Sequence, residues 1–468
     1  MADKKQTYEQ SHGAAKVVTG SAHLLVTEKS KILIDCGMFQ GKNEHMNDEP
    51  FTFDAKKIDA VILTHGHLDH VGRLPLLYKL GFKGKIYAHP ITFDIAKVVL
   101  MDSGKLQEEE YETKYKKAQR VGKENLIKKP LYTKDDVKAM FKKMKKNFIE
   151  YKKPVKITKD IKATFKDAGH ILGSAFVEID YKEFGITKRV VFSGDLGNKD
   201  NNILPEVKKP TYTDALFIES TYGDRNHKSF EKSKVEFKKV IVDTLINGGN
   251  VVIPSFAIER AQQLLCILKE MSEEKSLPKD AKVFLDSPMA SKVTNVYKKW
   301  DHFLRKNCQK YNNHPFEFPQ LRLVKDVEES KKINSITRGA VIIAGSGMCN
   351  GGRILHHFKH NIWNHKNSIL FVGYQAEGTL GRKIIEGARY IRIYHEEIAI
   401  KAKIHTINGF SAHAGQNELL EWMSEFKELN RIFLIHGEYD KQLVLKKVTE
   451  EKLNKPVHIV EMREKIYL

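Results

Sequence analysis

Residues 65–70 read His65-Gly66-His67-Leu68-Asp69-His70 and place three imidazoles and one carboxylate within six positions. They follow residues 59–63, Asp-Ala-Val-Ile-Leu, whose apolar positions 60–63 predict a buried strand ending at Thr64. A loop after a buried strand presents functional side chains on a rigid base, and imidazoles with carboxylates are ligands that suit Zn²⁺. The segment therefore predicts a metal site at the end of a strand.

Further ligands must come from other segments, because six residues cannot complete the shells of two metal ions. His170 precedes a predicted strand, Asp195 follows one, and His436 ends the apolar run 434–435. Taken alone, each also fits a structural role, such as a packed histidine or a turn-forming aspartate. Asp35 follows the apolar run 32–34, where an acid at a strand end can orient a metal ligand through a hydrogen bond.

The pattern of apolar residues indicates an α/β protein in which one domain is inserted into another. Short strands are expected at 24–26, 32–34, 86–88, 175–181, 189–193 and 216–218. After Thr221, helices at 230–246, 259–271, 291–300 and 353–360 alternate with strands at 251–253, 283–285, 340–344 and 369–372. This alternation predicts a parallel sheet. From about Ile391 the chain becomes rich in β structure again.

The charge of the chain fits either a polyanionic partner or a lysine-rich solvated surface. The 468 residues carry 79 Lys and Arg against 59 Asp and Glu, a formal net charge of +20. The segment Lys105–Lys166 holds 20 basic and 9 acidic residues and includes an expected helix at 135–148. This segment fits either a basic rim that gathers phosphates or a solvated helical surface.

Composition also indicates the cellular compartment in which the protein is expected. The four cysteines are scattered and form no CxxC pair, which disfavours disulfide scaffolds and cysteine–zinc sites and fits a reducing compartment. Met1–Gln6 leads into no apolar core of a signal peptide, and no run of about 18 apolar residues is present. We therefore expect a cytoplasmic protein with no membrane partner.

The order of these motifs resembles that of the metallo-β-lactamase superfamily. Three later segments, 218–223, 409–414 and 435–437, are similar to the additional motifs of its β-CASP branch. That branch includes the endonuclease subunit of the eukaryotic pre-mRNA cleavage and polyadenylation machinery, its archaeal and bacterial relatives, and RNase J. The resemblance covers nearly the whole chain. It implies a four-layer αββα metallo-β-lactamase fold, formed by residues 1–210 and 391–468, with an inserted α/β β-CASP cap domain at 211–390.

The resemblance also implies roles for individual residues. Two zinc ions per chain would be held by two sets of ligands bridged by Asp195, namely His65, His67 and His170 in one set and Asp69, His70 and His436 in the other. The implied catalytic residues are His413, Glu219, Asp69 and Asp35, with His413 as the general acid and Glu219 as its orienting partner. Ser346, Arg353 and Ser411 are the implied ligands of RNA phosphates.

One position departs from the family pattern. Relatives often carry Asp two residues after the histidine that matches His413, whereas this chain has Gly415. A carboxylate expected to steady that loop is therefore missing. His23 lies in a glycine–serine turn and fits a structural role or a position near the cleft.

The function implied is hydrolysis of single-stranded RNA by a zinc-bound hydroxide, with endonucleolytic cleavage favoured, in RNA processing or decay. A DNA-directed β-CASP nuclease is the nearest alternative, but such relatives generally lack the histidine found here at His436. A hydrolase of small esters would not need the inserted domain or the basic charge. A non-catalytic RNA-binding partner would lack metal ligands, and none is missing here. A homodimer is left open.

Overall fold

The structure is a computed structural model that describes residues 6–309 and 314–468. The chain forms two compact units, which are described separately. Unit 1 comprises Met1–Lys199, Glu206–Asn226 and His413–Leu468, and unit 2 comprises Asp200–Pro205 and His227–Ala412. All of the predicted metal ligands lie in unit 1, whereas the predicted phosphate ligands lie in unit 2.

Unit 1 is built on two mixed sheets, each with seven strands among the described residues. The first has the order β22 (Lys465–Tyr467), β1 (Tyr8–Ser11), β2 (His23–Val26), β3 (Lys31–Ile34), β4 (Ala60–Ile62), β5 (Lys85–Ala88) and β6 (Lys145–Phe148). The second has the order β21 (Val457–Ile459), β20 (Leu429–Ile435), β11 (Thr213–Glu219), β10 (Ile186–Phe192), β9 (Ala175–Glu183), β8 (Ile161–Asp167) and β7 (Val155–Lys156).

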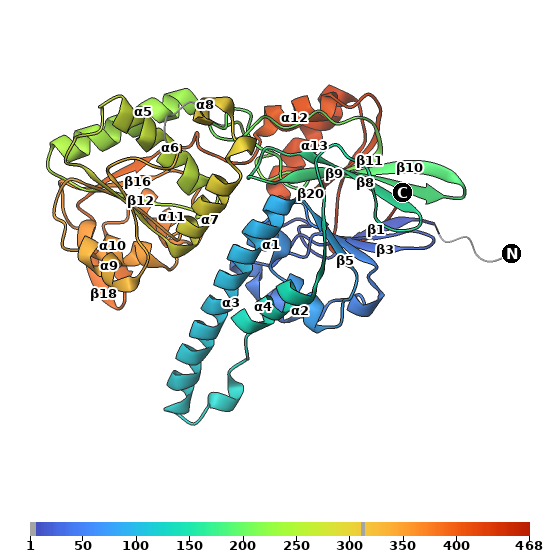
Figure 1. Cartoon of the computed structure of the whole chain (residues 1–468), viewed down its shortest axis with the longest axis horizontal. Helices are drawn as coiled ribbons and strands as arrows, with labels where there is room; N and C mark the ends of the chain where they lie inside the picture. Colours follow the sequence, from blue (N-terminus) through green and yellow to red (C-terminus); the bar gives the residue numbers. More distant parts are fainter. Residues whose placement is uncertain (1–5, 310–313) are drawn as a thin grey trace. The chain divides into compact units, whose positions relative to one another are not determined.

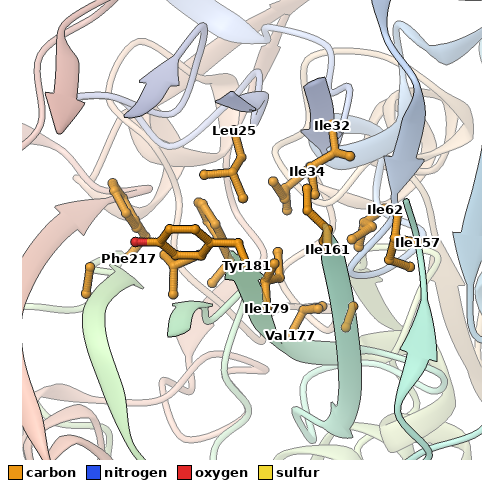
Figure 2. Packing of buried hydrophobic residues seen from close by; sticks show 14 of the residues in the cluster. Leu25, Ile32, Ile34, Ile62, Ile157, Ile161, Val177, Ile179, Tyr181 and Phe217 are labelled. Carbon is orange, nitrogen blue, oxygen red and sulfur yellow. The ribbon is translucent and has the colours of Figure 1, made fainter. Parts of the chain in front are cut away.

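The two sheets pack face to face because alternate residues of their strands are apolar. On β3, Ile32 and Ile34 point toward the second sheet, while Leu33 points to the other side. On β9, Ile179 and Tyr181 point back toward the first sheet. Figure 2 shows these side chains meeting between the sheets. Strand β3 is therefore apolar on both faces, whereas the other face of β9 carries charged residues such as Glu178 and Asp180.

Helices cover the outer face of each sheet. The first sheet is covered by α1 (Leu68–Val71), α2 (Leu74–Lys79), α3 (Pro90–Gln119) and α4 (Lys134–Lys143). The second is covered by α12 (Gln416–Ser424) and α13 (Tyr439–Leu453). Short 3₁₀ segments connect some of these elements, at η1 (Gly41–Asp48), η2 (Ala55–Lys57) and η3 (Glu124–Leu126). The layers are therefore helix, sheet, sheet and helix, which confirms the predicted αββα fold.

The basic segment folds differently from the expected helix at 135–148. Helix α4 ends at Lys143, and Met144 already has extended backbone angles. Residues 145–148 then form β6, which pairs with β5 in parallel at the edge of the first sheet. Backbone pairing with β5 therefore overrides the helical pattern of the last four residues. Upstream, α3 runs for 30 residues and spans about 45 Å, and Figure 1 shows its far end extending beyond the first sheet.

Unit 2 is an α/β domain with a parallel sheet, as the alternation of helices and strands predicted. Its strand order is β14 (Leu321–Leu323), β13 (Lys282–Asp286), β15 (Ala340–Ala344), β12 (Val251–Pro254), β16 (Ser368–Phe371) and β19 (Lys403–Thr406). Helices α9 (Val327–Ile333), α10 (Arg353–Asn361) and α11 (Leu380–Ile385) pack into one apolar cluster with this sheet. On the other face, Figure 1 shows α5 (Phe230–Ile246) and α6 (Arg260–Glu273).

The remaining elements of unit 2 are α7 (Pro288–Lys299), η4 (Asp301–Phe303), α8 (Lys306–Gln309) and the hairpin of β17 (Tyr390–Ile393) and β18 (Glu396–Ala399). Strand β19 pairs with β16, so the chain beyond residue 390 still contributes to this sheet. The compact unit accordingly continues to Ala412. In the part of the chain that the structure describes, no helix combines the length and apolar character needed to cross a bilayer.

Candidate metal centre

Ligand-type side chains from four segments of the chain meet in unit 1, close to the ends of strands. One group contains His65, His67, His170 and Asp195, and a second contains Asp69, His70 and His436. Within each group, one ligand atom per residue lies within 4.8 Å of every other. The structure thus brings together all seven side chains that the sequence singled out as metal ligands.

In the first group, ring nitrogens face one another. The Nε2 atoms of His65 and His170 lie 3.0 and 3.2 Å from Nδ1 of His67. Burial holds the pKa of His65 well below its usual value and lowers that of His67 to about 4. These rings are therefore neutral, which is the form in which imidazole offers a lone pair to a metal ion.

In the second group, each histidine is oriented by a hydrogen bond at Nδ1, the ring nitrogen that faces away from the centre. Asp35 accepts a 2.7 Å hydrogen bond from Nδ1 of His70 and two of 2.8 Å from the amide and hydroxyl of Thr64. Nε2 of His70 then lies 3.2 Å from Nε2 of His436, whose Nδ1 lies 3.1 Å from the Thr221 hydroxyl. Asp69 Oδ2 lies 3.5 Å from the same His436 nitrogen. Such outer contacts fix the ring that a metal ion would bind.

Asp195 lies between the two groups. Its Oδ2 is 3.5 Å from both His65 Nε2 and His170 Nε2, and its Oδ1 is 3.3 Å from His70 Nε2. Oδ1 is also buried, and it has no hydrogen-bond partner among the residues that the structure describes. An unpartnered buried carboxylate oxygen is costly unless a cation compensates it. The donor set therefore fits divalent cations, with one carboxylate oxygen directed to each group.

The local backbone explains how Asp195 reaches this position. Gly194 has φ of +53°, and a Cβ there would lie 3.0 Å from the Ala175 carbonyl oxygen and 2.9 Å from Thr64 Cβ. A side chain at position 194 would push the loop that carries Asp195 away from Thr64 and from the segment His65–His70. Glycine at this turn is thus required for the close approach of the two loops.

His413 is held beside this centre by Glu219. Its Nδ1 lies 3.1 and 3.2 Å from the two carboxylate oxygens of Glu219 and 4.0 Å from Asp195 Oδ2. The backbone of His413 forms an isolated antiparallel bridge with Gly197. Although burial opposes charge on His413, the Glu219 carboxylate raises its pKa to about 9. The ring can therefore carry a proton at the edge of the metal centre, where its side chain is 21% exposed.

The carboxylate missing at Gly415 is replaced by another residue. Glu418, in the first turn of α12, accepts hydrogen bonds from the amides of Gly415 at 2.7 Å and Lys199 at 2.8 Å. The loop that carries His413 is steadied by this side chain. His23 is buried, and its Nδ1 lies 2.8 Å from the Ser11 hydroxyl and 3.2 Å from Glu9.

The three predicted phosphate ligands lie in unit 2. Arg353 begins α10, and its guanidinium pairs with buried Asp286. Asp286 also accepts 2.6 Å hydrogen bonds from His357 Nε2 and the Ser330 hydroxyl. The Ser346 hydroxyl donates to the Gly351 carbonyl, and Ser411 is mostly buried. Their role toward RNA stays a prediction.

Sequence reasoning missed several supporting residues. Thr64 and Thr221 orient metal-site histidines, and Asp286 holds Arg353. Asp286 is the last residue of β13, and Asp35 comes directly after β3, so the same strand-end pattern could have identified Asp286. The two threonines carry no comparable signal, because a hydroxyl in a loop is common.

Comparison with known families agrees with this architecture. Residues 15–248 match the metallo-beta-lactamase superfamily, residues 261–384 the Beta-Casp domain, and residues 397–460 the Zn-dependent metallo-hydrolase RNA specificity domain. A chain of unknown function from Enterococcus faecalis has a similar fold, with a TM-score of 0.56 at 12% identity, covering 99% of this chain and 100% of its own.

Individual relatives match over most of the chain. Ribonuclease TTHA0252 of Thermus thermophilus is 40% identical over 439 residues, covering 93% of this chain and 94% of the relative. Transcription termination factor FttA is 33% identical in both Methanosarcina mazei and Methanocaldococcus jannaschii, covering 91% and 92% of this chain. The chain spans about two thirds of those archaeal factors, 66% and 67% of their length. It therefore belongs to the β-CASP branch of the metallo-β-lactamase superfamily.

Proposed function

We propose that the chain is a ribonuclease that uses two zinc ions to hydrolyse phosphodiester bonds within RNA. The observation that carries the proposal is the placement of Asp195, whose two oxygens face two different sets of imidazoles. One carboxylate positioned in this way can serve two cations. A pair of metal ions suits in-line displacement at phosphorus, because it can stabilise both the attacking and the leaving oxygen.

The contacts between the candidate ligands divide them into two sets, one for each zinc ion. One ion would be held by His65, His67 and His170, the other by Asp69, His70 and His436, with Asp195 shared. When bound, the ions supply positive charge to the phosphate oxygens and lower the pKa of a water molecule. Asp35 and Thr221 keep Nε2 of His70 and His436 directed into the centre, so the ligands are preorganised before substrate arrives.

The proton for the leaving oxygen would come from His413. Glu219 accepts from Nδ1 of His413 and stabilises the protonated ring, which fixes the orientation needed for proton donation. The same three residues, Asp195, Glu219 and His413, could instead hold a cation by their geometry. The contact between His413 and Glu219 favours the role of general acid. Nδ1 of His413, which lies 4.0 Å from Asp195, is already engaged by Glu219 and is therefore not available to a cation.

RNA is favoured over DNA by the matched RNA specificity domain and by the ribonuclease relative that covers nearly the whole chain. His436 also stands at the motif position that DNA-directed relatives generally lack. Ser346, Arg353 and Ser411 would contact phosphates of the bound strand. A DNA-directed nuclease is the second candidate, since a basic chain attracts both polymers.

Covalently closed RNA tests the mode of cleavage. The zinc-loaded protein is expected to convert a circular single-stranded RNA into linear and then shorter products, because an internal cut needs no free end. The measurement compares this circle with a linear RNA of the same sequence labelled at one end, and with a DNA circle as control. Cleavage of linear RNA with an intact circle would reject the endonucleolytic mode, and preferential cleavage of the DNA circle would reject RNA as the substrate.

Salt dependence tests whether the basic segment contacts RNA. Lys142, Lys143, Lys145 and Lys146 are all exposed, at the end of α4 and on β6. Reversing these four charges should make the log–log dependence of RNA affinity on salt shallower, by about 0.7 for each phosphate that is no longer neutralised. The measurement is RNA affinity between low and physiological salt for both proteins.

A second variant controls for net charge alone. It reverses four exposed lysines elsewhere in unit 1, namely Lys29, Lys56, Lys57 and Lys83. If both variants change the slope equally, the effect comes from the overall field and the segment makes no specific contact. An unchanged slope in the first variant would identify the segment as a solvated surface.

A further inference from the structure

A polar pocket lies in unit 1 apart from the metal centre, and none of the candidate metal ligands lines it. His12, Phe39, Glu49, Phe51, Arg73 and Arg463 are among the residues that form it. These residues come from the N-terminal strand region, the η1 loop, the start of α2 and the C-terminal segment. Its volume of about 20 Å³ admits one or two oxygen-sized atoms, since about 10–15 Å³ holds one water molecule.

Arg73 is the deepest charged group of the pocket. It is 4% exposed, and its guanidinium lies 4.7 and 5.0 Å from the ring centres of Phe39 and Phe51. Nε donates to the Gly37 carbonyl at 2.6 Å, but the buried Nη2 has no hydrogen-bond partner among the described residues. Within residues 6–309 and 314–468, no carboxylate forms an ion pair with Arg73. A buried cation in this condition is destabilising unless an anion compensates it.

His12 contributes a second unpartnered nitrogen. It is 8% exposed and packs edge-on against Phe53 at 4.9 Å, and its Nδ1 lies 2.7 Å from the Thr52 hydroxyl. Its Nε2 is buried and has no hydrogen-bond partner in the described part of the chain. Burial, reinforced by Arg463 and Arg73, lowers the pKa of His12 to about 4, so the ring is neutral. When Thr52 donates to Nδ1, Nε2 carries the ring hydrogen and becomes a donor.

The pocket has an excess of positive charge. Arg463 and Glu49 form an ion pair at 2.9 Å, with side chains 45% and 47% exposed. Glu49 attracts Arg73 but already forms an ion pair with Arg463. The charges of Glu49 and Arg463 compensate each other, and the positive charge of Arg73 remains uncompensated. A neutral donor and one uncompensated guanidinium suit a singly charged oxyanion. Arginine is also the side chain whose planar fork matches phosphate oxygens.

We propose that the pocket formed by Arg73, His12 and Arg463 binds the oxygens of a phosphate group, at a site separate from the metal centre. Arg73 and His12 donate to the anion from the interior, and Arg463, paired with Glu49, lies at the opening. The small volume admits phosphate oxygens and excludes a whole nucleotide. The phosphate group could belong to a phosphodiester of bound RNA or to free inorganic phosphate, because both present the same oxygens. The RNA source rests on the proposed function.

The test begins with crystals of the zinc-loaded protein grown with tungstate, a phosphate-like oxyanion with a strong anomalous signal. A peak is expected between Arg73 and His12, in addition to any at the metal centre. Titration calorimetry with inorganic phosphate then compares Arg73→Met, Glu49→Gln and wild type. Loss of the Arg73 donor should weaken phosphate binding roughly 10- to 100-fold, as for one hydrogen bond to a charged group. Glu49→Gln should strengthen it, up to about fivefold, because it removes a negative charge from the opening.

The matched control is Asp48→Asn, which removes the same charge one residue away. Asp48 is 47% exposed, as Glu49 is, but it pairs with Lys128 and does not line the pocket. It should leave phosphate affinity unchanged. If Arg73→Met does not fold, His12→Phe removes the other donor and keeps a ring against Phe53, and Glu49→Gln alters only an exposed side chain.

The kinetics of RNA cleavage distinguish the two sources of phosphate. A raised KM for RNA with unchanged kcat in Arg73→Met identifies a phosphodiester of the substrate, whereas unchanged RNA kinetics with weakened phosphate binding identify free phosphate. Both outcomes support the site. A tungstate peak confined to the metal centre, or equal phosphate affinity in wild type, Arg73→Met and Glu49→Gln, would overturn it. Such a failure would leave RNA cleavage by the wild-type protein, and so the proposed function, intact.

Discussion

Asp195→Ala is expected to remove metal from both ligand groups at once and to abolish RNA cleavage. The wild-type protein should hold two zinc ions per chain, and the variant should lose more than one of them. The loss of rate should exceed the roughly 10²–10⁴-fold that general acid–base catalysis contributes, since charge stabilisation and the acidified water both depend on the metal ions. Elemental analysis and RNA cleavage by the same preparations measure the two effects.

The physical reason lies in the two oxygens of Asp195. Oδ1 lies 3.3 Å from Nε2 of His70, and Oδ2 lies 3.5 Å from Nε2 of His65. Although burial opposes its charge, the surrounding histidines hold the pKa of Asp195 well below its usual range. The residue therefore stays ionised, and its removal takes one negative ligand from each ion.

Asp69→Ala provides the matched comparison. Asp69 lies 3.5 Å from His436 Nε2 and belongs to the second ligand group alone. Its removal should empty one site and leave the other occupied. If Asp195→Ala lowers zinc content by no more than Asp69→Ala does, Asp195 does not bridge. A wild-type protein with one zinc ion or fewer would count against the binuclear centre itself.

The gathering of the candidate metal ligands was predictable because its signal in the sequence is local and dense. Residues 65–70 follow the buried strand β4, and a rigid strand end with three imidazoles has few interpretations. The orienting role of Asp35 followed from its position after β3, and its contact with His70 agrees with that expectation. Strands of unit 2 such as β15 were equally clear, since a parallel strand covered on both faces is apolar at every position.

Features that depend on distant partners were not predictable. Strand β6 is mostly exposed and lysine-rich, and its conformation is set by pairing with β5. Glu418 steadies the loop at Gly415 partly through the amide of Lys199, which lies 219 residues away along the chain. The phosphate pocket joins His12 and Arg73 to Arg463, which lies far along the chain from both. Tertiary packing decides each of these cases.

His413→Ala is expected to slow RNA cleavage by roughly 10²–10⁴-fold while zinc content and RNA affinity stay close to those of wild type. Its Nδ1 is engaged by Glu219, and the ligand groups on either side of Asp195 are complete without it. The defect should shrink on a nitrophenyl phosphodiester, whose leaving group departs without a proton. Rates on both substrates, with zinc content, provide the measurement.

Two further variants decide between an acid and a metal ligand at this position. Glu219→Gln keeps the shape of the residue but removes the charge that stabilises protonated His413, so it should reproduce part of the same substrate-dependent defect. His436→Ala should instead lose zinc and slow both substrates alike, because His436 belongs to the second ligand group. If His413→Ala behaved as His436→Ala does, then the cluster of Asp195, Glu219 and His413 would have to be assigned to a cation, and the leaving oxygen would need another source for its proton.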